Sequence, residues 1–158
     1  MRALALSLAL VLLASCNGES DPTSPDGPVP FTEVAKQNST GIRTRRAEII
    51  SRESRWIEVW DEITATQSPK PPRPQVNFET QILILAAYGE TGDACRDVQI
   101  EKVDRRSGVL EVSILDKRRE PNCAACPAIV VQPVHVVSVA RAATGASYTW
   151  RVTTQPCT

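Results

Sequence analysis

Residues 81–88 constrain the fold of this chain more than any other segment. The run from Gln81 to Tyr88 is apolar at nearly every position and contains four consecutive branched residues, Ile82 to Leu85. A strand with one wet face alternates apolar and polar side chains, whereas a continuous apolar run suits a strand that is covered on both faces. We therefore expect a central strand here, with a packed layer on each side.

Other segments show the patterns of additional strands. Leu110, Val112 and Ile114 alternate with polar residues, which is typical of a half-buried strand. A slip in the alternation before Val103 predicts a bulge near Lys102. The strands expected besides the central one are residues 42–50, 98–103, 110–114, 129–139 and 148–153, with a hairpin turn at 106–108, a loop over 116–125 and a bend or edge position at Pro133.

One amphipathic helix is expected over residues 52–63. Trp56, Trp60 and Ile63 fall on one stripe at helical spacing, while charged residues occupy the other side. Ser51 is the candidate N-cap, and prolines between 69 and 74 predict a stiff extended loop over 64–75. Because the strands follow one another with short links, antiparallel pairing is favoured. The expected class is α+β, mostly antiparallel β, with the helix packed on the sheet.

The amino terminus has the features of a secretory signal. Residues 1–15 combine an early arginine, an apolar stretch from Ala3 to Leu13 and small residues before Cys16. The apolar stretch is shorter than the roughly 20 residues that span a bilayer. The order Leu13-Ala14-Ser15-Cys16 is similar to a bacterial lipobox, in which cleavage precedes the cysteine and the cysteine carries the lipid, including palmitate.

This signal predicts the location of the protein. Cys16 is expected to be the lipidated first residue of a protein anchored in the bacterial cell envelope. Asn17 follows it, and the absence of aspartate there favours the outer membrane, on its periplasmic or surface face. Residues 16–30 are rich in Gly, Ser, Asp and Pro and are expected to form a disordered tether, which leaves residues 31–158 as one folded domain.

The charge and the cysteines limit the possible partners and cofactors. Lys+Arg and Asp+Glu both number 18, so nothing indicates a nucleic-acid partner. Four cysteines remain beyond Cys16, and an even number in an exported protein favours disulfides over free thiols or zinc. Their pairing is left open among Cys95, Cys123, Cys126 and Cys157. The Cys123–Cys126 spacing is interpreted as a structural loop disulfide, with a redox centre as the alternative.

No catalytic set is recognisable in the sequence. The chain has no phosphate-binding glycine loop, no nucleophile elbow and no zinc-protease motif. His135 is the single histidine and is expected to be either structural or a partner contact. An arginine-rich stretch supplies further candidates for partner contact, namely Arg43, Arg45, Arg46, Arg52 and Arg55. We therefore expect neither an enzyme nor a bound cofactor or metal.

The order of several weak motifs resembles the carboxy-terminal domain of the PrcB-like lipoproteins, which stabilise a bacterial surface protease complex. The matching motifs, in chain order, are Trp56 with Trp60, the Pro-rich loop, Val76-Asn77-Phe78, the turn Gly89 to Gly92, and Pro133-Val134-His135-Val136-Val137. The chain departs from the family pattern at Asn77, where an aspartate is usual, and after Thr91-Gly92, where Asp93 follows instead of Gly-Tyr.

The resemblance implies a non-catalytic accessory domain that binds other proteins, with a partner changed from that of the family. The expected partner is an exported or membrane-associated protein, such as a protease, contacted through the turn at residues 90–95. The partner-contact candidates are Glu90, Thr91, Gly92, Asp93 and His135. Two alternatives stay open: an envelope thiol–disulfide protein that uses Cys123 and Cys126, and a structural lipoprotein without a specific client.

Overall fold

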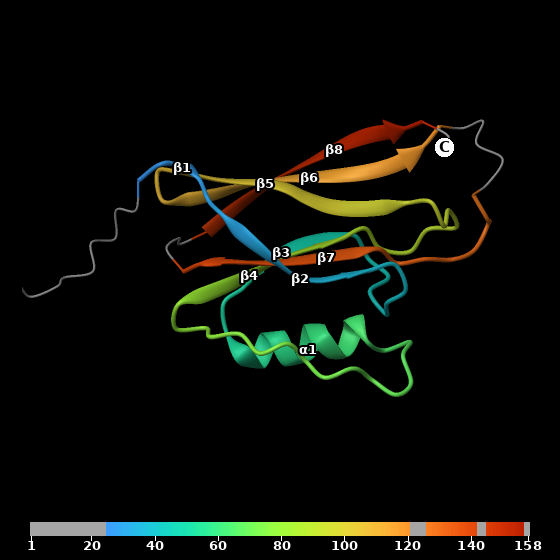
Figure 1. Ribbon diagram of the computed structural model, residues 1–158, viewed down its shortest axis with the longest axis horizontal. Helices are drawn as coiled ribbons and strands as arrows, with labels where there is room; N and C mark the ends of the chain where they lie inside the picture. Colours follow the sequence, from blue (N-terminus) through green and yellow to red (C-terminus); the bar gives the residue numbers. More distant parts are fainter. Residues whose placement is uncertain (1–24, 121–125, 142–144, 157–158) are drawn as a thin grey trace, which may run out of the picture.

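Three layers make up the part of the chain that the computed structural model describes, which comprises residues 25–120, 126–141 and 145–156 (Figure 1). One sheet has the strand order β1-β5-β6-β8, the second has the order β2-β7-β4-β3, and helix α1 covers the outer face of the second sheet. The elements are β1 (Gly27–Pro28), β2 (Phe31–Gln37), β3 (Arg46–Ile50), α1 (Glu53–Ile63), β4 (Gln81–Ala87), β5 (Asp97–Arg106), β6 (Val109–Arg119), β7 (Val134–Ala140) and β8 (Gly145–Gln155). The described helix is too short and too polar to cross a membrane.

Strand β4 is the central strand that its apolar run predicts. It pairs with β3 on one side and β7 on the other. Ile82 and Ile84 belong to the core between the two sheets, whereas Leu83 and Leu85 belong to the core shared with α1. Because successive side chains of a strand point to opposite faces, a strand between two cores must be apolar at every position. The continuous run of residues 82–87 is explained by this position.

Helix α1 carries its apolar residues into the second core. Trp56, Val59, Trp60 and Ile63 are buried there. The indole Nε1 atoms of Trp56 and Trp60 donate hydrogen bonds to the carbonyls of Pro74 (3.0 Å) and Pro71 (3.3 Å), so the Pro-rich loop lies over the tryptophans. The predicted N-cap is wrong by one residue: Arg52 holds this position without a side-chain hydrogen bond.

The strand pairs are antiparallel except one. Strand β8 pairs with β6 in parallel over eleven positions, from Gly145 opposite Val109 to Gln155 opposite Arg119. Between β6 and β8 the chain forms β7 in the second sheet. When it returns to the first sheet, β8 runs in the same direction as β6. The rule that short links produce antiparallel neighbours does not apply to a pair separated by such a crossover. The same pairing extends β6 to Arg119, where the sequence predicts a loop from residue 116 onward.

Two local predictions on β5 are confirmed. The register with β6 shifts between Ile100 and Lys102, which is the bulge expected near Lys102. The turn to β6 is the two-residue link Ser107-Gly108, where both residues have positive φ, 50° and 77°. Positive φ at both central positions suits the right-handed twist of a two-residue hairpin. The hairpin therefore places β5 and β6 side by side with little freedom.

The folded region begins earlier than Phe31. Gly27 and Pro28 form β1 and pair with Arg105 and Asp104 of β5, and Val29 is buried in the core between the sheets. The predicted tether therefore ends before Gly27, because Val29 supplies apolar surface that the core buries. Residues 1–24, with Cys16, lie outside the described residues. Strand β2, Phe31–Gln37, is an addition that the sequence pattern did not indicate.

Candidate functional site at the disulfide end

The end of the molecule that carries residues 88–96 and 126–132 is called here the disulfide end. Its loop is held at both sides: Glu90 N donates to Arg43 O (3.0 Å), and Thr91 exchanges backbone hydrogen bonds with Val131 (3.0 and 2.9 Å). Gly89 has φ +89°, and a Cβ there would lie 2.7 Å from Arg45 N. Only glycine fits this close passage, so the loop leaves β4 along a defined path.

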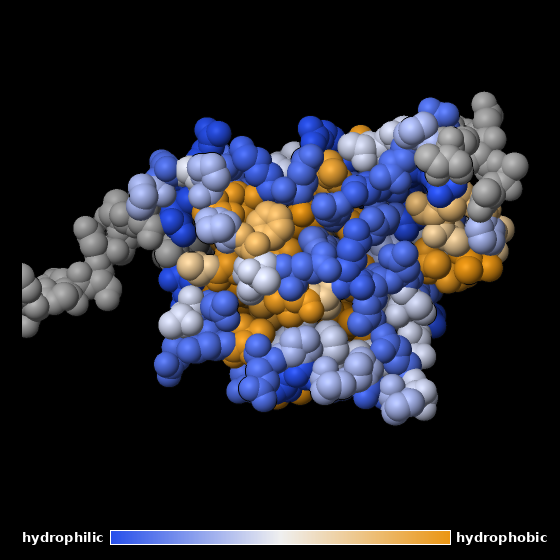
Figure 2. Space-filling view, in the orientation of Figure 1, coloured by the Kyte–Doolittle hydropathy of each residue, from blue (hydrophilic) through white to orange (hydrophobic). Residues whose placement is uncertain are grey.

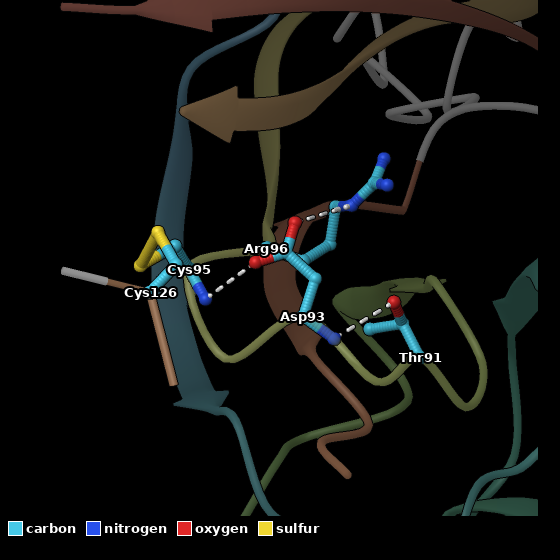
Figure 3. Close-up of a disulfide and its surroundings, with 5 residues drawn as sticks. All are labelled: Thr91, Asp93, Cys95, Arg96 and Cys126. Carbon is cyan, nitrogen blue, oxygen red and sulfur yellow. Dashed lines mark hydrogen bonds and ion pairs between the residues drawn. A yellow bond between two sulfur atoms is a disulfide. The ribbon is translucent and has the colours of Figure 1, made fainter. Parts of the chain in front are cut away.

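A disulfide between Cys95 and Cys126 fastens this loop to the segment that leads to β7 (Figure 3). The Cα atoms are 5.5 Å apart, and 31 positions separate the two cysteines in the sequence. In the chain-entropy description, closing a loop of this length stabilises the folded state by about 4 kcal/mol. The Cys95 amide also donates to Asp93 Oδ1 (3.0 Å), which orders the turn before the cysteine.

This pairing corrects the interpretation of the Cys123–Cys126 spacing as a local disulfide. Cys126 is bonded to Cys95, in the loop that follows β4. Cys123 and Cys157 lie outside the described residues. One carboxylate oxygen of Asp93 lies within 4.8 Å of both sulfur atoms. Asp93 Oδ2 faces Arg96 Nε at 3.8 Å, so an acidic and a basic side chain both lie beside the disulfide.

Arginine and aromatic side chains alternate beside the disulfide. The Arg96 guanidinium lies 4.6 Å from the ring centroid of Tyr88. The Arg45 guanidinium lies 5.4 Å from the centroid of the same ring and 4.0 Å from the ring centroid of Trp150 on β8. Such contacts are favourable because the ring faces carry partial negative charge. The layer joins the two sheets, since Tyr88 follows β4 and Trp150 belongs to β8.

A buried carboxylate fixes one end of this layer. Asp116 on β6 has no exposed surface and accepts hydrogen bonds from Arg96 Nη1 (2.7 Å) and Arg118 Nη2 (3.0 Å). Burial by itself raises the pKa of the Asp116 carboxyl, but the hydrogen bonds from Arg118 and Arg96 outweigh it and leave the pKa below its ordinary value. The ionised Asp116 neutralises Arg96 and holds it against Tyr88.

Arg45 is in a different situation from Arg96. It is exposed, and it forms neither an ion pair nor a hydrogen bond with any residue that the structure describes. Its guanidinium is nevertheless held in position by the two rings. A positioned cation without a counter-charge is suited to contact an acidic group from outside.

Apolar side chains are exposed at the same end. Ile129 and Val130 are 56% and 60% exposed, and Val152 near the end of β8 is 53% exposed. Figure 2 shows apolar surface gathered over the segment that precedes β7. Aromatic, arginine and exposed aliphatic side chains together have the composition of protein-binding surfaces.

The partner-contact residues predicted in the turn lie beside this surface. Glu90 and Gly92 are exposed, whereas Thr91 and Asp93 are half-buried and engaged in the turn. The structure thus brings Glu90 to Asp93 close to Arg45 and Tyr88, which the sequence reasoning did not connect with the turn. The sequence could have indicated Tyr88 as a site residue, because Tyr88 ends the apolar run of β4 where the chain turns.

His135 does not belong to this surface. Its side chain is only 3% exposed, and Nδ1 accepts a hydrogen bond from the Ile100 amide (2.9 Å). The neutral ring then carries its proton on Nε2, which faces Glu33 Oε2 at 3.0 Å. Burial lowers the pKa of His135, and the hydrogen bond to Glu33 opposes this only in part. His135 joins the two sheets, which agrees with the structural role that the sequence offered beside partner contact.

No family model, no curated protein and no solved structure matches this chain. The geometry of the disulfide end is therefore the basis for assigning a function. Among the described residues, the group formed by Asp93, Cys95 and Cys126 is the candidate for metal binding, and its sulfurs are joined in the disulfide.

Proposed function

We propose that this chain is a non-catalytic binding domain that is held in the bacterial cell envelope by a lipid on Cys16 and contacts another exported protein through the disulfide end. The observation that carries the proposal is the guanidinium of Arg45, which contacts the rings of Tyr88 and Trp150 and has no acidic partner among the described residues. Arginine and tryptophan are the residue types that most often dominate binding energy in protein interfaces.

The rigidity of the disulfide end supports the same function. The loop is fastened by the Cys95–Cys126 bond and by the Thr91–Val131 bridge. A surface that is ordered before binding loses less conformational entropy when the partner arrives, which improves affinity without further contacts. In this proposal α1 is a scaffold, packed by its apolar face on the second sheet, and does not contact the partner.

A thiol–disulfide function receives less support. That alternative uses Cys123 and Cys126 as a redox pair, whereas Cys126 is bonded to Cys95. The resemblance to the PrcB-like lipoproteins stays a prediction, and it makes an envelope protease the first partner to examine.

Site-specific photocrosslinking in intact cells tests the proposal. A photoreactive phenylalanine analogue replaces Glu90 or Val130 at the disulfide end, or Ile57 on α1 as the matched control. Ile57 is 42% exposed and apolar like Val130, but it lies on the helix side of the second sheet. One dominant protein crosslinked from the first two positions and absent from the control is the expected result. Envelope proteins captured from all three positions in proportion to their abundance would contradict the proposal.

The anchor is tested separately by mass spectrometry of the amino-terminal peptide. The expected peptide begins at Cys16 and carries fatty acyl chains. A soluble protein with an unmodified cysteine, or with cleavage at another position, would remove the tether from the proposal and leave the binding surface to be judged by the crosslinks alone.

A further inference from the structure

We infer that the free edge of β8 is the docking line for an extended segment of the partner, which adds to the first sheet as a strand and offers a carboxylate to Arg45. The inference rests on the proposed function and specifies how the partner binds. Its starting point is a comparison of the four sheet edges, because an unpaired strand edge presents backbone N–H and C=O groups to any extended chain.

Three of the edges carry features that discourage pairing. Strand β1 has only two residues, and β3 has five, of which Arg46 and Glu48 are charged. Strand β2 contains a register shift between Glu33 and Ala35 and also carries Lys36. Short length, charged side chains and bulges are the devices by which natural sheets protect their edges.

Strand β8 is neither short nor interrupted by a bulge, and it carries a single charged residue. It is eleven residues long, and its pairing with β6 runs through all eleven positions without a register shift. Arg151 is its single charged residue and is paired with Glu101 at 2.5 Å. No second strand lies along β8 within the described residues. An edge of this length and regularity is suited to recognise an extended peptide by main-chain hydrogen bonds.

The side chains beside this edge indicate what the added strand carries. Trp150 packs against the core between the sheets, and by the alternation of a strand Val152 lies on the same face. An apolar side chain of the added strand would cover Val152, which is 53% exposed. The next position on that face, two residues away, would lie beside Trp150 and the guanidinium stacked on it. The recognised sequence therefore combines an apolar and an acidic residue two positions apart.

The alternative occupant of this edge is the β8 strand of a second copy of this chain. The composition of β8 argues against such self-pairing. Strand β8 contains no aspartate or glutamate. Pairing of two β8 strands would therefore bring no carboxylate to Arg45 and would bury its charge without a counter-charge, which is costly. A segment of another protein that carries an acidic residue would both pair with the backbone of β8 and supply a counter-charge to Arg45.

The test begins with the purified full chain, with its disulfide intact, as the target for selection from a library of displayed random peptides. The selected peptides are synthesised with fluorescent labels, and their affinity is measured by anisotropy. We expect alternating sequences with one acidic and one apolar residue two positions apart. Backbone N-methylation of one alternate set of residues should weaken binding at least tenfold, while methylation of the other set leaves it unchanged, because only every second amide of an added strand faces β8.

Variants of the protein test whether the peptide binds along β8. Arg45→Glu and Val152→Lys should each weaken binding at least tenfold, whereas Val109→Lys on β6, another exposed valine, should leave it unchanged. Arg45→Gln provides a milder change should the charge reversal disturb the fold. Hydrogen exchange with bound peptide should slow specifically for amides within residues 145–155.

Several outcomes would overturn the inference. These are a failure of the selection to enrich peptides, binding that responds equally to both methylation sets, or self-association of the protein through β8 in light scattering. Should a partner crosslink from Glu90 and Val130 while the β8 amides exchange as before, the proposed function stands and this docking mode fails. Peptide binding on β8 without a crosslinked partner in cells would instead support the edge and contradict the proposed function.

Discussion

Arg45 and Arg46 are neighbours in sequence, yet they belong to opposite sides of the second sheet. Arg46 faces α1, where Nη2 meets Glu62 Oε2 at 2.8 Å and Nε meets Glu48 Oε1 at 3.2 Å. Arg45 faces the first sheet and stacks on Trp150 without an acidic partner among the described residues. The same residue type is thus neutralised on the helix side and left available at the disulfide end.

The regions around Arg46 and Arg45 differ in the same way as the two residues do. Around α1, arginines are matched by glutamates, as in the pair of Arg55 with Glu48 and Glu58. At the disulfide end, Arg43 pairs with Glu90 and Arg96 pairs with Asp116, whereas Arg45 contacts aromatic rings. Among the described residues, Arg46 and Arg55 on the helix side are therefore neutralised, while the disulfide end leaves the Arg45 cation and apolar surface uncovered. The difference predicts that stability depends on the first region and binding on the second.

The largest effect should come from the tryptophans. Trp56→Ala removes a side chain that is 1% exposed and should lower the free energy of unfolding by about 3–5 kcal/mol. Trp150→Ala removes a half-buried ring and should cost about 1–2 kcal/mol while it weakens partner crosslinking from Val130. Urea unfolding of both variants measures the difference. Equal losses of stability would contradict the division into a stabilising and a binding region.

The disulfide should have the next largest effect. Replacement of Cys95 and Cys126 by alanine together should lower the free energy of unfolding by about 2–4 kcal/mol, because the unfolded chain loses a covalent constraint. The same double variant should give less crosslinked partner from position 130, because the segment that carries Val130 is no longer bonded to the loop after β4. Peptide mapping without reduction provides the control: a Cys123–Cys126 link in the wild-type protein would contradict the pairing.

A smaller effect is expected from pH, through His135. Its pKa is lowered in the folded protein by burial, so the unfolded chain binds a proton more readily. The stability that this group contributes is present above its unfolded pKa of about 6.5 and is lost as pH falls towards the folded pKa. His135 is the single histidine, so urea unfolding at pH 7.5, 6.5 and 5.5 reports on it. The variant His135→Gln should lose this slope, and parallel slopes for both proteins would show that another group is responsible.

The smallest change in stability is expected for the two neighbouring arginines. Arg45→Gln and Arg46→Gln should each alter the free energy of unfolding by about 1 kcal/mol or less, as is usual for surface cations and for ion pairs that keep some exposure, such as that of Arg46 with Glu62. Only Arg45→Gln should reduce partner crosslinking from Val130. Equal crosslinking by the two variants would remove Arg45 from the binding surface and with it the contrast between the two sides.

Much of the fold could be predicted because local patterns and tertiary environment agree. The apolar run before Tyr88 requires two cores, the spacing of Trp56 and Trp60 requires a helix, and Ser107-Gly108 requires a turn. The parallel pairing of β6 and β8 could not be predicted, since it depends on β7 lying in the other sheet. Strand β2 carries mixed charged and apolar residues at a sheet edge, and such a pattern does not distinguish a strand from a loop.

The candidate site was predictable only in part. The turn after Tyr88 was indicated, but its companions come from segments far away in sequence: Arg45 precedes β3, and Trp150 lies on β8. The role of His135 stayed open between a structural role and partner contact, because a histidine between valines has the same sequence pattern whether its ring meets solvent or, as here, the Ile100 amide. The pairing of Cys95 with Cys126 needed the same long-range information.

The sequence by itself determined the helix and most of the strands, though not β1 or β2, because hydrophobic periodicity is a local property that each segment carries with it. It also determined that the apolar surface is sufficient for two cores, one on each side of β4. Only the tertiary structure decided which charges find partners. Arg46 meets Glu62 and Arg45 meets Trp150 because the side chains of these neighbours, one in β3 and one just before it, point to opposite layers. The residues that they meet in each layer come from elsewhere in the chain.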